Sequence, residues 1–330
     1  MTHPTWHPDS LADRRPFLRR RSALTSATRC FFTDRGYTEV ETPYAVPVPG
    51  EDVHLRAFAT QQTDPDGTVR PLWLHTSPEF AMKRLLVAGA EPIFQFARVW
   101  RNHEGSALHA PEFTMLEWYR PGASLDSLIG ETTDLLRAVL PPVVTCLGVR
   151  TDLSRVERLT MAEAFRRDVG ADVLATAGDA AALAAAAAVR LRDGEDWEDL
   201  FFRLLLDKVE PRIGHAHPTF LTHWPAAQAA LARRDPADPR VAERFELFVC
   251  GIELANAFVE LTDAVEQRAR FEADRSRRHA LYGPDWPLDE DFLSALAHGM
   301  PPAAGIALGF DRLAMIAAGA DRISQVMWLG

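Results

Sequence analysis

The chain has 330 residues, 47% of them hydrophobic, enough to bury a large core in one domain or two. Its 36 Lys and Arg residues face 46 Asp and Glu residues, a formal charge of −10, so the chain as a whole has no electrostatic pull toward nucleic acid. No apolar core follows the N-terminal arginines and no apolar run approaches the roughly 20 residues of a membrane span, so we expect neither a secretory signal nor a membrane segment.

The first predicted element is a long helix. Ser10 and Asp13 form a capping box that begins it, and it runs to about Arg35. The apolar stripe predicted for this helix comprises Phe17, Leu24, Ala27 and Phe31.

Strands and short helices follow in alternation. A first strand is predicted at 37–43, and the segments 53–60 and 69–76 flank "DPDG", a strong hairpin signal. The remaining predictions up to residue 140 are a helix at 77–90, strands at 92–100 and 112–120, and a helix at 124–140.

The C-terminal half begins with a mainly helical, Ala-rich stretch at 160–235, interpreted as an insertion or flanking layer. The predictions that follow it are strand at 244–261, a helix capped by Asp263 and Glu266 and running to about Tyr282, a short helix after 283–287, and a strand feeding a helix at 305–319. Hairpin-linked strands favour an antiparallel sheet flanked by helices, an α+β fold, which we expect to form a single domain.

The cysteines and histidines carry no metal signature. Three scattered cysteines indicate reduced thiols and a cytoplasmic protein. His215 and His217 would share one face of a strand, but no third ligand is near them, so we do not expect a metal there.

A first cluster of chemical groups lies on the strand predicted at 112–120. Alternate residues of a strand share a face, so Phe113, Glu117 and Tyr119 point the same way. The alternative interpretation is an ordinary half-solvated strand face.

A second cluster consists of Glu246, Glu253 and Glu260, spaced seven apart. That spacing also fits one face of a helix, but the intervening β-branched and aromatic residues favour strand. Carboxylates inside an apolar sheet require cations, either an ammonium group or Mg²⁺ bound to nucleotide phosphates.

The third cluster is "GIALGFDR", residues 305–312. Small residues at 305, 307 and 309 allow a ligand close to the backbone, and Arg312 offers donors that match phosphate oxygens. A glycine-rich turn of this kind, taken alone, is more often a simple packing feature.

Together these segments resemble a known family. "GYTEVETP", "RNHEGSALHAPEFTMLEWY" and "GIALGFDR" are similar to motifs 1, 2 and 3 of the class II aminoacyl-tRNA synthetases, over about residues 10–330. "TSPE" and "FELFVCGIELANAFVELTD" resemble the lysyl branch. Only some ten residues precede the first helix, so we expect no anticodon-binding barrel, and this pattern resembles the elongation factor P (R)-β-lysine ligases, paralogues that acylate a protein lysine.

The resemblance implies ATP-dependent activation of (R)-β-lysine to an adenylate, followed by transfer to a lysine side chain of elongation factor P. The resemblance implies two catalytic residues. Arg101 would bind the α-phosphate and the substrate carboxylate, and Arg312 would bind the γ-phosphate and stack on adenine. The implied amino-acid site comprises Ser77, Glu79, Glu117, Tyr119, Asn256, Glu260 and Ala307. The implied ATP site comprises Arg101, Asn102, His103, His109, Ala110, Phe113, Glu253, Leu254, Gly309 and Arg312, with Mg²⁺ on Glu246 and Glu253.

The sequence departs from the family pattern at two positions of motif 2. His103 stands where the family usually has glutamate, with Glu104 next, and Ala110 stands where asparagine is usual. Both departures bear on adenine contacts. Ala307 stands where lysyl synthetases usually have glycine and β-lysine ligases have alanine, so its methyl group is expected to favour β-lysine over α-lysine.

The resemblance also implies a homodimer built on motif 1, with Pro43 at the strand end, and we expect no tight binding of tRNA. Three alternatives remain open at this point. They are a truncated lysyl-tRNA synthetase-like enzyme acting on α-lysine, an aspartate–ammonia ligase of the same fold, and a non-catalytic regulatory paralogue.

Overall fold

The computed structural model describes residues 4–329. The chain forms two compact units: unit 1 runs up to Ala123 and resumes at Leu261, and unit 2 is Ser124–Glu260. Within the described residues no helix is long and apolar enough to cross a membrane.

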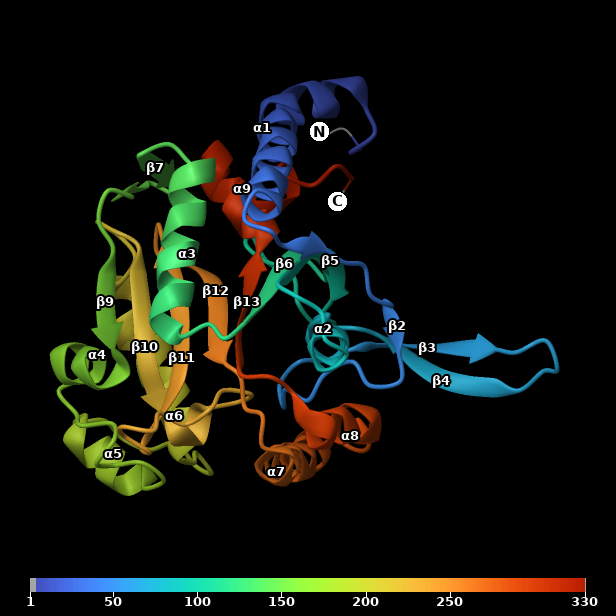
Figure 1. Ribbon diagram of the computed structural model, residues 1–330. Helices are drawn as coiled ribbons and strands as arrows, with labels where there is room; N and C mark the ends of the chain where they lie inside the picture. The colour runs from blue at the N-terminus through green and yellow to red at the C-terminus, as the bar shows by residue number, and fades with distance from the viewer. Residues whose placement is uncertain (1–3, 330) are drawn as a thin grey trace. The chain divides into compact units, whose positions relative to one another are not determined.

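Unit 1 contains two sheets. One has the order β1-β5-β6-β13, with β1 parallel to β5 and the other neighbours antiparallel, and the second has the order β2-β4-β3. Its strands are β1 (Thr38–Glu39), β2 (Ala45–Val46), β3 (Phe58–Thr63), β4 (Val69–Leu74), β5 (Ile93–Trp100), β6 (Glu112–Pro121) and β13 (Ala303–Gly309). Its helices are α1 (Pro8–Thr33), α2 (Glu79–Val87), α7 (Ala264–Tyr282), α8 (Glu290–Gly299), α9 (Phe310–Ala318) and the short η4 (Ile323–Gln325). Figure 1 shows β3 and β4 as a long hairpin extending beyond β2, as the "DPDG" turn predicted.

The long first helix is confirmed, but its cap and its buried stripe differ from the prediction. His7 is the N-cap, accepting a hydrogen bond from the backbone of Asp9, so the helix begins before Ser10. Ala27 is exposed, and the buried stripe is Leu18, Arg21, Leu24, Thr28, Phe31 and Phe32. Arg21 and Thr28 are polar, so the buried stripe lacks the purely hydrophobic spacing on which the prediction relied.

Arg21 is buried in a polar cluster with Asp311 and Thr114. Asp311, at the start of α9, accepts from the Arg21 guanidinium with one oxygen and from the backbone N–H of Thr114 with the other, at 2.7 Å. Arg21 also donates to the Thr114 hydroxyl at 3.0 Å. One carboxylate therefore links α1, β6 and α9.

Unit 2 is built on the sheet order β12-β11-β10-β9, with β9 parallel to β10 and the rest antiparallel, and a separate β7-β8 hairpin. Its strands are β7 (Val143–Cys146), β8 (Val149–Asp152), β9 (Glu157–Thr160), β10 (Thr219–Pro225), β11 (Val241–Val249) and β12 (Ile252–Val259). Its helices are α3 (Leu125–Val139), α4 (Met161–Asp168), α5 (Ala180–Ala186), α6 (Trp197–Leu204), η1 (Leu205–Val209), η2 (Glu210–Arg212) and η3 (Ala226–Gln228).

The stretch 160–235 is mainly helical as far as Arg212, and beyond that it contains the strand β10 (Thr219–Pro225) and only the short helix η3. Rings from α4, α6 and β10 form the core here: Phe165 and Phe201 stack with centroids 5.1 Å apart, and Trp224 meets Phe201 edge-on. Both faces of β10 are buried, so its sequence lacks the alternation that marks a half-exposed strand.

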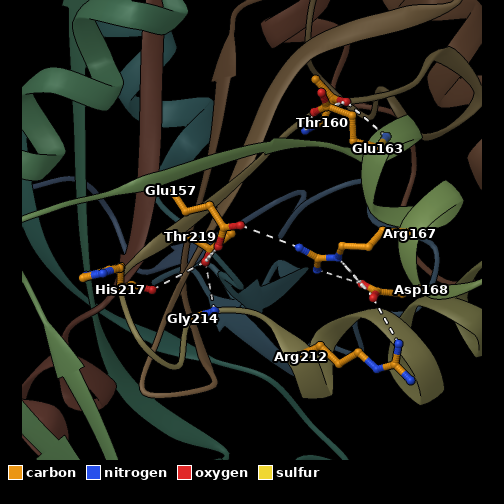
Figure 2. A network of polar contacts seen from close by, with 9 residues as sticks. All are labelled: Glu157, Thr160, Glu163, Arg167, Asp168, Arg212, Gly214, His217 and Thr219. Atoms are coloured by element: carbon orange, nitrogen blue, oxygen red, sulfur yellow. Dashed lines mark hydrogen bonds and ion pairs between the residues drawn. The ribbon is translucent and has the colours of Figure 1, made fainter.

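A polar network anchors the turn before β10 (Figure 2). The Asp168 carboxylate accepts from the guanidinium groups of Arg167 and Arg212, at 2.7 and 3.1 Å. Arg167 lies 3.6 Å from Glu157, which accepts from the Thr219 hydroxyl at 2.9 Å. These contacts join α4 to β9 and β10, and the Asp168 side chain is only 4% exposed.

The predicted strand at 244–261 is a hairpin of two strands, β11 and β12. Its turn consists of Cys250 and Gly251, both with positive φ (54° and 70°), the backbone of a tight hairpin turn. The register shifts between the pairs Leu247–Ala255 and Phe248–Glu253, so β12 carries one extra residue, a β-bulge.

Candidate active site

Glu117 of β6, the acid of the first predicted cluster, is fully buried, with none of its surface exposed. The Ser77 hydroxyl donates to its Oε1 at 2.5 Å, and the Tyr119 hydroxyl donates to its Oε2 at 3.1 Å. The half-solvated strand face considered as an alternative is therefore wrong, since residues 114–119 are all buried.

Burial raises the pKa of Glu117 to about 8, and the nearby charge of Glu79 adds to the effect. The hydrogen bonds from Ser77 and Tyr119 and the charge of Arg101 lower that pKa, but by less. A carboxyl group in this state ionises readily when a cation approaches it, as a substrate ammonium would.

Glu79, in the first turn of α2, is held next to Ser77. Its backbone N–H donates to the Ser77 hydroxyl at 3.0 Å, so one hydroxyl connects the start of α2 to Glu117. Its carboxylate accepts from Lys83 one helical turn later, at 2.6 Å, and Lys83 is only 1% exposed. The sequence interpretation missed Lys83, although the i, i+4 spacing in "EFAMK" was a visible signal.

The loop between β5 and β6 carries the motif 2 residues. The Arg101 guanidinium lies over the Phe113 ring, 5.4 Å from its centroid, and Asn102 forms a backbone bridge to Arg56. His103 has a positive φ of 64° and is exposed. Ala110 is partly buried.

Arg312 of α9 reaches this loop. Its Nη2 lies 2.5 Å from Nε2 of His109, whose Nδ1 is 2.9 Å from the Ser106 hydroxyl. Because a guanidinium only donates, Nε2 of His109 is the acceptor in this contact. Gly309 is the N-cap of α9, and a β-carbon there would meet only the Arg312 side chain, at 3.4–3.7 Å.

Ala307 is the cross-strand neighbour of Glu117 in the β6–β13 pair. Its methyl group packs on a small apolar cluster of Ala97, Val99, Met115 and Phe113. Residues directly opposite on an antiparallel pair share a face, so Ala307 borders the same face as the Glu117 carboxylate.

Unit 2 carries the other predicted residues on β11 and β12, so the helix considered for Glu246, Glu253 and Glu260 is wrong. Glu246 pairs directly with Asn256, and the bulge brings Glu253 opposite Phe248. Glu260, at the end of β12, is 2% exposed, and Leu254 is likewise buried.

Burial raises the pKa of Glu246 to about 8; the charge of Arg244 opposes this, and the charges of Glu253 and Glu210 reinforce it. This donor set suits a hard cation that brings further oxygen ligands, as a magnesium–nucleotide complex does. Among residues 4–329 no group of three or more His, Cys, Asp or Glu side chains is arranged to hold a metal ion by itself.

Arg244 contacts two of the predicted residues of unit 2, although the sequence interpretation did not single it out. It donates to both Glu246 and Asn256. The only available signal was its position two residues before Glu246, on the same face of a strand.

Comparison with known proteins agrees with this geometry. The family model for class II tRNA synthetases (D, K and N) matches residues 11–330. A protein of Sodalis glossinidius named elongation factor P–(R)-β-lysine ligase is 47% identical over 319 residues, covering 94% of this chain and 93% of its own length. Proteins of the same name from Klebsiella pneumoniae and Salmonella arizonae are 45% and 44% identical over 329 residues, covering 98% of this chain and 96% of their own length. The chain therefore belongs to the class II (D, K and N) tRNA synthetase family and, within it, to the family of the elongation factor P–(R)-β-lysine ligases.

Proposed function

We propose that this chain activates (R)-β-lysine with ATP and transfers the β-lysyl group to a lysine side chain of elongation factor P. The names of its full-length relatives support the substrates, and the family match supports ATP-dependent adenylate formation. The structural observation that carries the proposal is Glu117, an acid with no exposed surface that accepts from two hydroxyl donors and whose pKa burial raises to about 8.

In the first half-reaction a carboxylate oxygen of the amino acid attacks the α-phosphorus of ATP, and pyrophosphate leaves. Arg101 neutralises the α-phosphate and the carboxylate, while Arg312 and His109 take the γ-phosphate side of the nucleotide. Phe113 supplies the aromatic surface for adenine, and Asn102, His103, Ala110, Leu254 and Gly309 complete the nucleotide site. Such a reaction depends on positioning and charge stabilisation more than on proton transfer.

The amino acid is recognised at its two ends. Glu117, Tyr119 and Glu260 bind the distal ammonium, and Asn256 binds the carboxylate. Glu79 and Ser77 bind the second amine, at the end bordered by Ala307. Two carboxylates and a phenol around an ammonium provide the pairing that a buried cation requires.

Glu246 and Glu253 are the residues that would hold Mg²⁺. When bound, Mg²⁺ supplies charge neutralisation for the phosphate oxygens. The raised pKa of Glu246 supports this role, because a carboxyl group destabilised in its charged form by burial gains from a cation.

In the second half-reaction the amine of a lysine on elongation factor P attacks the carbonyl carbon of the adenylate, AMP leaves, and the amine gives up a proton. We further propose a cytoplasmic homodimer that does not bind tRNA tightly. The three cysteines support a reducing compartment, since all of them are free thiols. A monomeric mass by light scattering at micromolar concentration would contradict the dimer.

The decisive experiment is ATP–pyrophosphate exchange with (R)-β-lysine and α-lysine side by side, followed by mass spectrometry of elongation factor P. We expect exchange to prefer β-lysine, elongation factor P to gain one β-lysyl group, and lysine tRNA to remain uncharged. Preference for α-lysine together with charging of tRNA would instead identify a lysyl-tRNA synthetase-like enzyme, and no exchange at all would identify a regulatory paralogue. Arg312→Ala serves as the inactive control, with exchange reduced about 100- to 1,000-fold.

A further inference from the structure

Each of the three guanidinium nitrogens of Arg244 donates a hydrogen bond within unit 2. Arg244 lies on β11 with only 8% of its surface exposed, and its guanidinium stacks 4.0 Å from the centre of the Trp224 ring. Nη1 donates to the backbone carbonyl of Gln228 at 2.7 Å. Nη2 donates to Glu246 at 2.7 Å and Nε donates to Asn256 at 3.2 Å.

These contacts follow from the register of the β11–β12 hairpin. Glu246 and Asn256 are directly opposite each other, and Arg244 precedes Glu246 by two residues on the same face. A planar guanidinium with donors on each edge reaches both neighbours at once, which the single ammonium of a lysine cannot do.

The contact with Asn256 determines which way its amide faces. Arg244 has donors only, so it must meet the Asn256 oxygen, Oδ1. The amide nitrogen, Nδ2, then occupies the other branch of the side chain, where its two N–H groups can donate. A carboxylate accepts hydrogen bonds and cannot donate them, so this orientation is the one that binds a carboxylate.

We propose that Arg244 is a positioning residue for amino-acid recognition: by holding the Asn256 oxygen, it presents the Asn256 amide N–H groups to the carboxylate of the substrate. The inference rests on the proposed role of Asn256 in carboxylate binding. A purely structural role for Arg244, limited to the Gln228 carbonyl and the Trp224 ring, is the alternative that the experiment must separate.

The test is calorimetric binding without ATP or metal, using (R)-β-lysine and 1,4-diaminopentane, which keeps the two amines of β-lysine at the same spacing but lacks the carboxylate. Arg244→Lys retains the positive charge near Glu246 but not the fork of donors. We expect it to weaken β-lysine binding by about 10- to 100-fold, the effect of losing a hydrogen bond to a charged group, and to leave diaminopentane binding within about twofold. Arg233→Lys is the matched control, since Arg233 pairs with Glu243 on the same strand through a similar fork but is 44% exposed. The Arg233→Lys variant should leave the binding of both ligands unchanged.

Asn256→Ala and the double variant complete a cycle. If Arg244 acts through Asn256, the double variant binds β-lysine no more weakly than Asn256→Ala alone. Equal losses for both ligands, or additive losses in the double variant, would overturn the positioning role. Should Arg244→Lys fail to fold, Asn256→Asp provides the second test: it still accepts from Arg244 but has no donor, so β-lysine binding alone should be lost. Equal loss of diaminopentane binding would again contradict the inference. If the wild-type protein binds no lysine isomer, the proposed function fails instead, independently of Arg244.

Discussion

At the residue scale, the amino-acid site contains one acid, Glu117, whose charged form is disfavoured by burial when no substrate is bound. Its two hydroxyl partners do not offset the penalty of burying the charged form. An ammonium ligand stabilises the ionised form of the Glu117 carboxyl group. Binding of the ligand is therefore linked to loss of a proton from Glu117.

Affinity for β-lysine should accordingly rise with pH. Below the pKa of about 8 for Glu117, each pH unit should change the dissociation constant by up to about tenfold, since the ionised form is the one that binds. The distal ammonium stays protonated up to about pH 9, so it does not reverse the trend earlier. Calorimetry in two buffers of different ionisation enthalpy at pH 7 should detect release of a proton. In Glu117→Gln, binding should be weak and independent of pH from 6.5 to 8.5, and an unchanged pH profile in that variant would contradict the assignment.

Ala307 gives a second prediction at this scale. Its methyl group borders the face of Glu117 and packs against Met115, so a glycine there would open space for one carbon on that face. We expect wild-type protein to activate β-lysine better than α-lysine and Ala307→Gly to narrow or reverse the ratio. A hydrophobic contact of this size discriminates by about 10- to 200-fold. Pyrophosphate exchange with both isomers measures the ratio, and an unchanged ratio in the variant would remove Ala307 from the specificity determinants.

At the scale of elements, the sequence predicted most of the strands and helices that carry the motifs, and the structure confirms them. It failed where the local signal was weak: β7, β8 and β9 have four residues each, too few to show a period, and β10 is buried on both faces. It also led to a proposal for the individual site residues, but not for the residues that hold them in place. Lys83 and Arg244 became visible only with the α2 contacts and the β11–β12 register, because their importance lies in which side chains they hold.

The Asp311 cluster gives the prediction for this scale. Asp311 is 1% exposed and receives hydrogen bonds from α1 and β6, so an amide at this position leaves the Arg21 charge buried without its partner. Asp311→Asn should lower the free energy of unfolding by about 3–5 kcal/mol, the usual cost of removing one member of a buried pair. Urea denaturation followed by circular dichroism measures it. Asp321→Asn, an exposed acid beyond the same helix, should stay within about 0.5 kcal/mol of wild type, and an equally small effect at Asp311 would show that the cluster does not hold the three elements together.

At the scale of the whole molecule, the buried acids affect stability as well as binding. Burial raises the pKa of Glu51 to about 7, of Asp274 to about 6, and of Glu117 and Glu246 to about 8. In the unfolded chain such groups have pKa values near 4. Between these values the folded protein holds protons that the unfolded chain releases, so the stabilisation is fully present below about pH 4 and is lost progressively as the pH rises from there to about 6 to 8.

Two other kinds of group make the stability rise with pH, but their effect between pH 5.5 and 8.5 is small. Burial lowers the pKa of His75, so the folded state binds fewer protons there and stability falls as the pH drops through about 6.5, but this is one group against four. Hydrogen bonds from arginines hold the pKa values of Glu195 and Asp238 at about 2, so their stabilisation is lost only as the pH falls below about 4. The net slope between pH 5.5 and 8.5 is therefore set by the raised carboxyl groups.

We expect the melting temperature of the protein without ligands to be higher at pH 5.5 than at pH 8.5. In Glu117→Gln, one of the contributing groups no longer titrates, so the difference between the two pH values should shrink. Saturating (R)-β-lysine should raise the melting temperature more at pH 8.5 than at pH 5.5, because the ligand binds the ionised form of Glu117 and supplies the cation that the empty site lacks. Scanning calorimetry at both pH values, with and without the ligand, measures all three effects. A melting temperature that rises from pH 5.5 to 8.5 without ligand would mean that these acids are already ionised in the empty protein, and the proton-linked recognition of the substrate ammonium would then be wrong.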